Sequence, residues 1–133
     1  MLTGGTHEGP GYWLRPAVIS GARAGDEVLR EELFAPVIAV QRFSTEAEAV
    51  QFANDCDYGL AASVWSKDGA RTGRVIRDLD FGETFVNCHQ ICPAEVPHGG
   101  FKQSGHGTDL SIFAIESYPR IKSVTVALGE AAE

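Results

Sequence analysis

The chain alternates short apolar runs with stretches whose apolar residues recur every three or four positions. Residues 37–43, 61–66 and 84–88 are rich in Val, Ile, Phe and Ala, a composition that predicts strands. The first of these runs is almost continuously apolar, which is typical of a strand covered on both faces. Residues 46–54 and 71–79 place apolar side chains on one side and predict amphipathic helices. The middle of the chain therefore predicts the order β-α-β-α-β.

Strands that alternate with helices in this way pair in parallel through right-handed crossovers, so we expect an α/β fold. Functional loops gather at the carboxyl ends of such strands. Thr45 and Glu48 have the three-residue spacing of a capping box at the start of the first helix. Asp68 is the expected N-cap of the second helix. Gly73 should weaken that second helix by roughly 1 kcal/mol relative to alanine.

The flanking segments carry weaker signals. Residues 12–19 predict an edge strand because a proline interrupts them. Residues 26–32 predict a short helix whose first residue, an aspartate, serves as the N-cap. A later helix is expected to be capped by Thr108 or Asp109 and to run to about Glu116.

The C-terminal residues 121–128 alternate in side-chain character. Isoleucine, serine, threonine and alanine fall on one face, and lysine, two valines and leucine fall on the other. This pattern predicts a terminal strand. The rest of the chain offers it no obvious partner strand.

Composition narrows the class of protein. The 133 residues are 44% hydrophobic and 22% charged, as in one globular domain or part of one. A net charge of −7 argues against a nucleic-acid partner. No apolar run approaches the roughly 20 residues of a membrane span, and the start lacks the features of a signal peptide. Three cysteines are an odd number, which suits reduced thiols better than a disulfide framework. We therefore expect a cytoplasmic protein without nucleic-acid or membrane partners.

The stretch from Val86 to Gly107 concentrates residues that can carry chemistry. It starts at a strand end, then passes two prolines and four glycines, and it holds three of the four histidines. Loops of this kind at strand ends often form active sites on a rigid scaffold. A long surface connection is the alternative interpretation.

A zinc site and a cysteine nucleophile are both weakly supported in this stretch. Cys88 and Cys92 have a workable spacing, but His98 and His106 are eight residues apart, whereas structural zinc sites usually use two close ligand pairs. We therefore predict no metal site. Cys56 precedes a Tyr-Gly turn and has no context that indicates a nucleophile.

Four motifs appear in a characteristic order. Residues 31–37 read E-E-L-F-A-P-V, residues 54–61 read N-D-C-D-Y-G-L-A, residues 86–87 read V-N, and residues 97–105 read P-H-G-G-F-K-Q-S-G. In order and spacing this set resembles the aldehyde dehydrogenase superfamily over the whole chain. The last motif is closest in wording to ω-aminoaldehyde members such as aminobutyraldehyde dehydrogenases.

The resemblance implies roles for three side chains. Glu32 and Phe34 match positions that hold the nicotinamide half of NAD or NADP, where a carboxylate offers two acceptor oxygens to the ribose diol. His98 matches an aromatic position that lines the aldehyde tunnel, where an imidazole can both pack and hydrogen-bond. Without the resemblance, these would be an exposed helix-end acid, a core phenylalanine and a solvent-exposed loop histidine.

Other motif residues look structural. Ala35 stands where the family usually has glycine. Because alanine carries a methyl group, the backbone at this position must keep a negative φ. Asn87 ends a strand and should satisfy backbone groups of the adjoining loop. The glycines at 99, 100, 105 and 107 do not have the spacing of a phosphate-binding loop, so we interpret them as positions of special backbone geometry.

Several family motifs do not occur in the sequence. These are the motif of the nucleophilic cysteine, the motif of the general-base glutamate and the glycine-rich turn of the dinucleotide domain. The resemblance therefore implies no catalytic residue in this chain. It implies that residues 1–118 are a C-terminal portion of the catalytic domain and that residues 119–133 are an oligomerisation strand and tail. A homo-oligomer would then form through Ile121 to Leu128.

The expected function is part of an NAD(P)-dependent aldehyde dehydrogenase that oxidises a small-molecule aldehyde to the carboxylic acid. An aminoaldehyde such as 4-aminobutyraldehyde is one candidate substrate. The chain alone should be inactive because it lacks the nucleophile and the general base. The alternative is a truncated, non-catalytic paralogue that self-associates or binds a partner.

Overall fold

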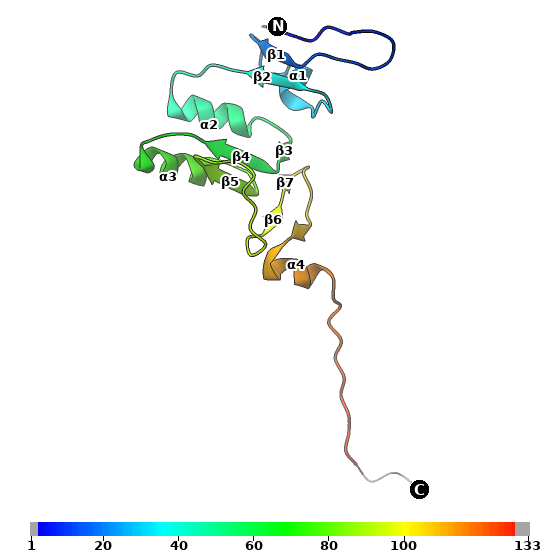
Figure 1. Ribbon diagram of the computed structural model, residues 1–133. Coiled ribbons are helices and arrows are strands. Elements are labelled where there is room, and N and C mark those ends of the chain that lie inside the picture. Colours follow the sequence, from blue (N-terminus) through cyan, green and yellow to red (C-terminus); the bar gives the residue numbers. More distant parts are fainter. Residues whose placement is uncertain (1–2, 130–133) are drawn as a thin grey trace.

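The computed structural model describes residues 3–129 of the chain. Its N-terminal part is a parallel strand pair. β1 (Ala17–Ser20) pairs with β2 (Val37–Val40), with Ala17 opposite Val37, and α1 (Glu27–Arg30) lies in the connection between them. Figure 1 shows this unit at the end of the molecule that carries the N-terminus.

A second parallel pair forms the middle of the molecule. β4 (Ala61–Val64) pairs with β5 (Glu83–Val86), and α3 (Gly69–Asp78) is the crossover helix between them. α2 (Glu46–Asn54) lies between this pair and the N-terminal unit (Figure 1). The order of helices and strands from residue 37 to residue 86 is thus the one predicted.

Both central helices begin where the capping residues predicted. Thr45 Oγ1 accepts a hydrogen bond from the Glu48 backbone N–H at 3.1 Å. The Asp68 carboxylate accepts hydrogen bonds from the N–H groups of Ala70 and Arg71 at 3.0 and 3.1 Å. These contacts satisfy donors that have no partner within the first helical turn.

Short antiparallel pairs organise the C-terminal third. β3 (Tyr58–Gly59) pairs with β7 (Phe101–Lys102), and β6 (His98–Gly99) pairs with β8 (Thr108–Asp109). α4 (Ser111–Ser117) follows. Figure 1 shows these elements beyond the β4–β5 pair, on the side away from the N-terminal unit.

The predicted α/β class is confirmed, but the strands do not form one continuous sheet. β2 and β4 belong to different two-stranded pairs, although α2 connects them. The expectation that residues 37–43 are covered on both faces is wrong for the described part of the chain, where Ile38 is 60% exposed. In the described chain the outer edges of the β1–β2 and β4–β5 pairs are therefore unpaired.

The early strand is shorter than predicted. Of residues 12–19, only those from Ala17 onward join a strand, and isolated bridges pair His7 with Leu14 and Thr3 with Val18. Asp26 stands at the N-cap position of α1 as expected, but its side chain does not cap the helix. The carboxylate instead accepts a hydrogen bond from the backbone N–H of Arg23 at 2.7 Å.

The start of α4 also differs from the prediction. Thr108 and Asp109 do not cap this helix, because both pair with β6 as strand β8. The N-cap position is held by Leu110 at a φ of 57°, with no side-chain cap. Strand pairing of the preceding residues therefore sets where the helix begins.

The predicted terminal strand is not formed within the chain. Residues 121–128 carry no strand assignment and run away from the remaining structure as an extended segment (Figure 1). Ile121 is 104% exposed and Leu128 is 98% exposed. The segment has no strand partner among the described residues, which agrees with the observation that the sequence offers it no obvious partner strand.

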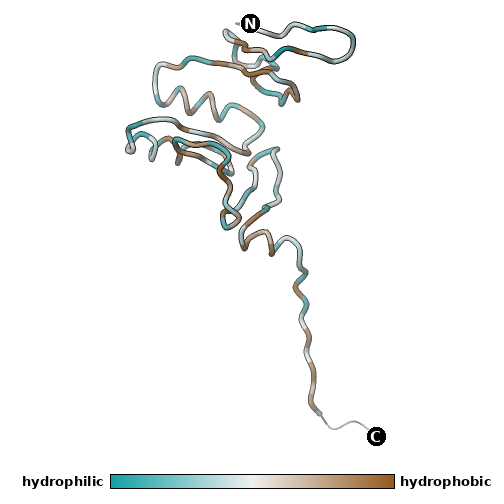
Figure 2. The backbone as a smooth tube through the Cα atoms, in the orientation of Figure 1, coloured by the Kyte–Doolittle hydropathy of each residue, from teal (hydrophilic) through white to brown (hydrophobic). Residues whose placement is uncertain are grey.

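Little apolar surface is enclosed in this structure. Among the described residues, the buried hydrophobic positions are Ala17 and Ala114. Figure 2 shows apolar stretches spread from the N-terminal strand pair to the C-terminal segment. No helix in residues 3–129 is long and apolar enough to cross a membrane.

Candidate functional site

The glycine-rich motif of residues 97–105 folds back onto the turn that follows α2. Strand pairing places Lys102 opposite Tyr58 and Phe101 opposite Gly59. The Ser104 hydroxyl accepts a hydrogen bond from the Gly59 N–H at 2.9 Å. Two of the four sequence motifs are therefore in direct contact, which gives their joint occurrence a structural reason.

Lys102 is the main anchor of this contact, and the sequence analysis assigned it no role. Its ammonium group donates to the carbonyl oxygens of Asn54 and Cys56 at 3.0 and 3.1 Å. It also lies 3.4 Å from the Asp80 carboxylate. The side chain is only 21% exposed and its backbone has a φ of 52°. Lysine thus satisfies carbonyl groups at the end of α2 and fixes the loop there.

Close backbone approach explains two of the glycines. A Cβ atom on Gly82 would overlap the carbonyl oxygen of Gly99. A Cβ on Gly100 would lie 2.5 Å from the Cβ of Ser104. The loop can pack against the start of β5 only because these side chains are absent. The prediction that the loop glycines serve backbone geometry is confirmed at Gly100, whereas Gly82 was not among the glycines that it named.

Asn87 behaves as the sequence predicted. Its amide oxygen accepts from the Ser66 N–H at 2.9 Å, and its amide nitrogen donates to the Ser66 carbonyl at 3.0 Å. The residue is solvent-exposed and has a φ of 54°, a left-handed conformation that asparagine tolerates well. It therefore joins the ends of β4 and β5 and has a structural role.

His98 is placed by β6 next to a carboxylate that the sequence analysis did not consider. Its Nδ1 atom lies 3.0 Å from Glu83 Oε1, at the start of β5. The Nδ1 atom is buried and, apart from this ion-pair contact, has no hydrogen-bond partner in the described chain. The imidazole is 38% exposed, whereas the Glu83 side chain is 9% exposed. His98 is thus accessible from solvent on one side only.

The proposed cofactor residues lie elsewhere. Glu32 and Phe34 belong to the exposed connection between α1 and β2, and the Phe34 side chain is 96% exposed. It is therefore not the core residue of the alternative interpretation. Ala35 keeps the negative φ that its methyl group requires. Figure 1 shows this connection and β6 on opposite sides of α2 and the β4–β5 pair.

The described chain therefore does not bring Glu32 and Phe34 together with His98. The exposed carboxylate can accept hydrogen bonds from ribose hydroxyls, and the exposed ring can pack against a flat ring. These two side chains therefore fit the nicotinamide half of a dinucleotide. The other wall of such a site is not supplied by the residues described.

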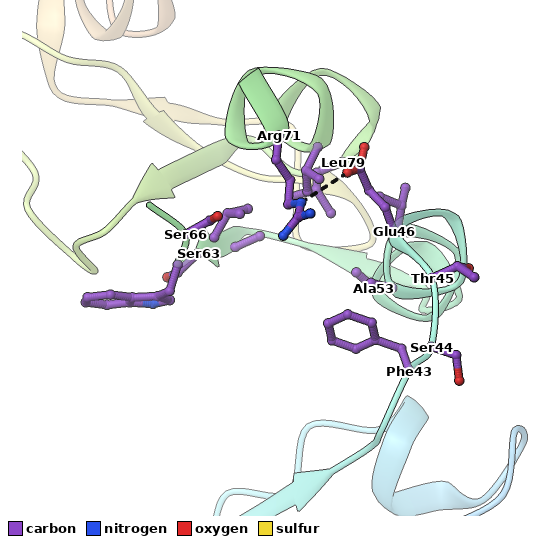
Figure 3. Close-up of a pocket in the computed structure, with 15 residues that line it drawn as sticks. Phe43, Ser44, Thr45, Glu46, Ala53, Ser63, Ser66, Arg71 and Leu79 are labelled. Atoms are coloured by element: carbon purple, nitrogen blue, oxygen red, sulfur yellow. Dashed lines mark ion pairs between the residues drawn. The ribbon is translucent and has the colours of Figure 1, made fainter. Parts of the chain in front are cut away.

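A cavity of about 540 Å³ opens between α2, α3 and β4 and contains none of the predicted site residues. In Figure 3, Phe43 lies on one side of it, and Arg71 and Leu79 lie on the other. Arg71 Nε is 3.6 Å from Glu46 Oε2 at its rim (Figure 3). The cavity is an open, largely apolar face.

Three potential metal ligands converge beside β5 and β6. They are the carboxylate of Glu83, the thiol of Cys92 and the imidazole of His98. Cys88 and His106, which were weighed with Cys92 and His98 for zinc binding, are not part of this group. All three cysteines are free thiols.

Comparison with known proteins gives a consistent result. Residues 1–124 match the model of the aldehyde dehydrogenase family. A chloroplastic betaine aldehyde dehydrogenase of Atriplex hortensis is 44% identical over 128 residues, which are 94% of this chain and 26% of that protein. The human 4-trimethylaminobutyraldehyde dehydrogenase is 40% identical over 120 residues, 90% of this chain and 24% of that protein.

Solved structures agree with this match. Betaine aldehyde dehydrogenase from Staphylococcus aureus in complex with NAD⁺ superposes with a TM-score of 0.83 at 38% identity, over 88% of this chain and 24% of the other. An NAD-dependent aldehyde dehydrogenase from Sinorhizobium meliloti gives a TM-score of 0.86 at 36% identity, over 99% of this chain and 26% of the other. The chain spans about a quarter of the length of these relatives.

Proposed function

Because the chain belongs to the aldehyde dehydrogenase family, we propose that it supplies the late catalytic-domain segment of an NAD(P)-dependent enzyme that oxidises an aldehyde to the acid. Residues 1–118 would form this segment, and residues 119–133 would form the oligomerisation strand and tail. The observation that carries the proposal is the docking of the 97–105 motif onto the 54–61 motif, through the β3–β7 pair. This contact holds in place the loop that carries His98.

In this proposal, Glu32 and Phe34 hold the nicotinamide half of the cofactor, which accepts the hydride when it is bound. The Glu32 carboxylate would accept hydrogen bonds from ribose hydroxyls, and the Phe34 ring would pack against the nucleotide. Their exposure on the α1–β2 connection supports the proposal because both side chains are free to meet a ligand. The solved structure from S. aureus contains NAD⁺.

For the substrate we propose an aminoaldehyde such as 4-aminobutyraldehyde. Support comes from the names of two relatives, which specify betaine aldehyde and 4-trimethylaminobutyraldehyde. His98 would line the aldehyde path, where its half-exposed ring can pack against a short alkyl chain.

We further propose that these 133 residues alone do not catalyse the reaction. No cysteine of the sequence stands in the family's nucleophile motif, and no glutamate stands in its general-base motif. Purified chain mixed with NAD⁺ and 4-aminobutyraldehyde should form no NADH, as followed by absorbance. Turnover that exceeds a protein-free blank would contradict this part of the proposal.

Cofactor binding is tested separately by calorimetry with NAD⁺. We expect weak, saturable binding that Glu32→Gln reduces several-fold, because the amide retains only one acceptor oxygen. Glu31→Gln is the matched control, since it removes the same charge one residue away from the motif position. Equal effects of the two substitutions, or no binding by the unaltered chain, would overturn the assignment of Glu32.

The second candidate function is a non-catalytic module that self-associates or binds a partner in the cytoplasm. It is favoured by the extended segment at residues 121–128, whose apolar side chains are exposed along its length. Absence of NAD⁺ binding combined with a defined oligomer would support this candidate. The two functions are therefore separated by calorimetry and native mass together.

A further inference from the structure

Glu83, Cys92 and His98 come from three different segments and meet at one point. Glu83 is the first residue of β5, Cys92 lies in the loop that follows β5, and His98 begins β6. Their ligand atoms all lie within 4.8 Å of one another. Glu83 Oε1 is 3.0 Å from His98 Nδ1 and 4.0 Å from Cys92 Sγ. No covalent or helical constraint requires this convergence.

The group differs from an ordinary cluster of surface acids. The Glu83 side chain is 9% exposed, and His98 Nδ1 is a buried atom without a hydrogen-bond partner. A buried polar atom without a hydrogen-bond partner is unfavourable. The Glu83 carboxylate accepts a long hydrogen bond from the Cys92 thiol and lies against an imidazole that is charged only when protonated, so it lacks a fixed compensating charge. A cation between the three ligand atoms would satisfy both groups at once.

We propose that Glu83, Cys92 and His98 form a binding site for a zinc-class divalent cation. Zn²⁺ accepts thiolate, imidazole and carboxylate ligands together. Around a tetrahedral Zn²⁺ such donor atoms lie roughly 3.3–3.7 Å apart, so side-chain adjustments on the order of 1 Å complete the site. A thiolate ligand disfavours Mg²⁺ and Ca²⁺, which prefer oxygen.

The charges and protons of the site balance. Coordination requires the Cys92 thiol to release its proton to solvent. The resulting thiolate and the Glu83 carboxylate then neutralise the two positive charges of the ion. His98 binds through Nδ1 and keeps Nε2 available on its exposed side. Three protein ligands leave a fourth position for water, as in zinc sites that are not closed.

The site explains why spacing in the sequence predicted no metal. Spacing along the chain pairs Cys88 with Cys92 and His98 with His106, but only one member of each pair belongs to the converging group. Glu83 comes from the far end of β5, so only the folded chain reveals it. The prediction of no metal site rested on spacing along the sequence alone. The proposed site does not depend on aldehyde oxidation or on NAD⁺.

The test uses the full chain with Co²⁺ alone and with Zn²⁺ alone. Co²⁺ should bind at one ion per chain and produce the near-ultraviolet charge-transfer absorption of a thiolate ligand, which Zn²⁺ then removes. Cys92→Ser should abolish this absorption and weaken Zn²⁺ binding by about tenfold or more. Cys88→Ser is the matched control and should leave both readouts unchanged.

The remaining ligands are tested in the same way. Glu83→Gln and His98→Gln should each weaken Zn²⁺ binding, whereas His106→Gln should not. Far-ultraviolet circular dichroism of every variant separates a lost ligand from a lost fold. Absence of metal binding by the unaltered chain would overturn the proposal. Equal losses in Cys88→Ser and Cys92→Ser, or Co²⁺ binding without thiolate absorption, would overturn it as well.

Discussion

At the scale of single residues, the packing of the loop of residues 97–105 depends on neighbouring glycines that have no side chain. Gly82 is the clearest case because a Cβ there would occupy the space of the Gly99 carbonyl oxygen. Gly73 in α3 is the opposite case, since a Cβ there meets no atom within 4 Å. Substitution by alanine should therefore stabilise the fold at Gly73 and destabilise it at Gly82.

We expect Gly73→Ala to raise the free energy of unfolding by roughly 0.5–1 kcal/mol, because alanine loses less backbone entropy in a helix. Gly82→Ala should lower it by about 1–3 kcal/mol through overpacking. Urea denaturation followed by circular dichroism measures both values. A neutral or stabilising effect of Gly82→Ala would show that the loop does not approach β5 as closely as described.

The sequence revealed residues whose signal is local. Asn87 was correctly interpreted because a strand-end asparagine has a characteristic structural use, and Thr45 was correctly placed as a cap. Lys102 and Glu83 were missed because their partners lie far away in the sequence. The contact of Lys102 with Asn54 spans 48 positions. Only tertiary folding determines such pairs.

At the scale of elements, the central helices and strands followed from periodicity and caps, whereas the pairing of the strands did not. The sequence pattern gave the order of β2, α2, β4, α3 and β5. It could not show that β2 and β4 would belong to separate pairs, since register and neighbour choice depend on distant residues. Contacts between α2 and α3 then link the two parts.

The Glu46 carboxylate supplies one such link. It accepts hydrogen bonds from Arg74 Nε and Nη2, both at 2.9 Å, and thereby joins α2 to α3. The Arg74 hydrogen bond holds the pKa of Glu46 below its usual value of 4.5. A carboxylate with a lowered pKa stabilises the fold above its unfolded pKa, and this contribution is lost as the pH falls through the folded pKa.

We therefore expect Glu46→Gln to lower the urea midpoint slightly at neutral pH, because exposed ion pairs contribute little. The difference from the unaltered chain should close as the pH falls below about 4.5. Urea titrations at several pH values measure this. Glu95→Gln, at an exposed loop position, controls for the loss of one negative charge. A difference that stays constant into acid would mean that the ion pair does not stabilise the fold.

At the scale of the whole molecule, many large apolar side chains are exposed among the described residues. The strand pairs have free edges, and the apolar cavity between α2, α3 and β4 is open. Residues 121–128 add an extended segment with exposed valines, isoleucine and leucine. Surfaces of this kind favour association with other chains.

The C-terminal segment gives the sharpest test at this scale. If residues 121–128 pair with a strand of another copy, the full chain should form a defined oligomer in native mass spectrometry. Deletion of residues 119–133 should then give a monomer with unchanged far-ultraviolet circular dichroism. Val124→Pro should act in the same direction because proline cannot donate to a strand ladder, and Val124→Thr is the matched control. If the oligomer survives the deletion, the chains associate through the free strand edges instead. If the full chain is a monomer, self-association is not one of its functions.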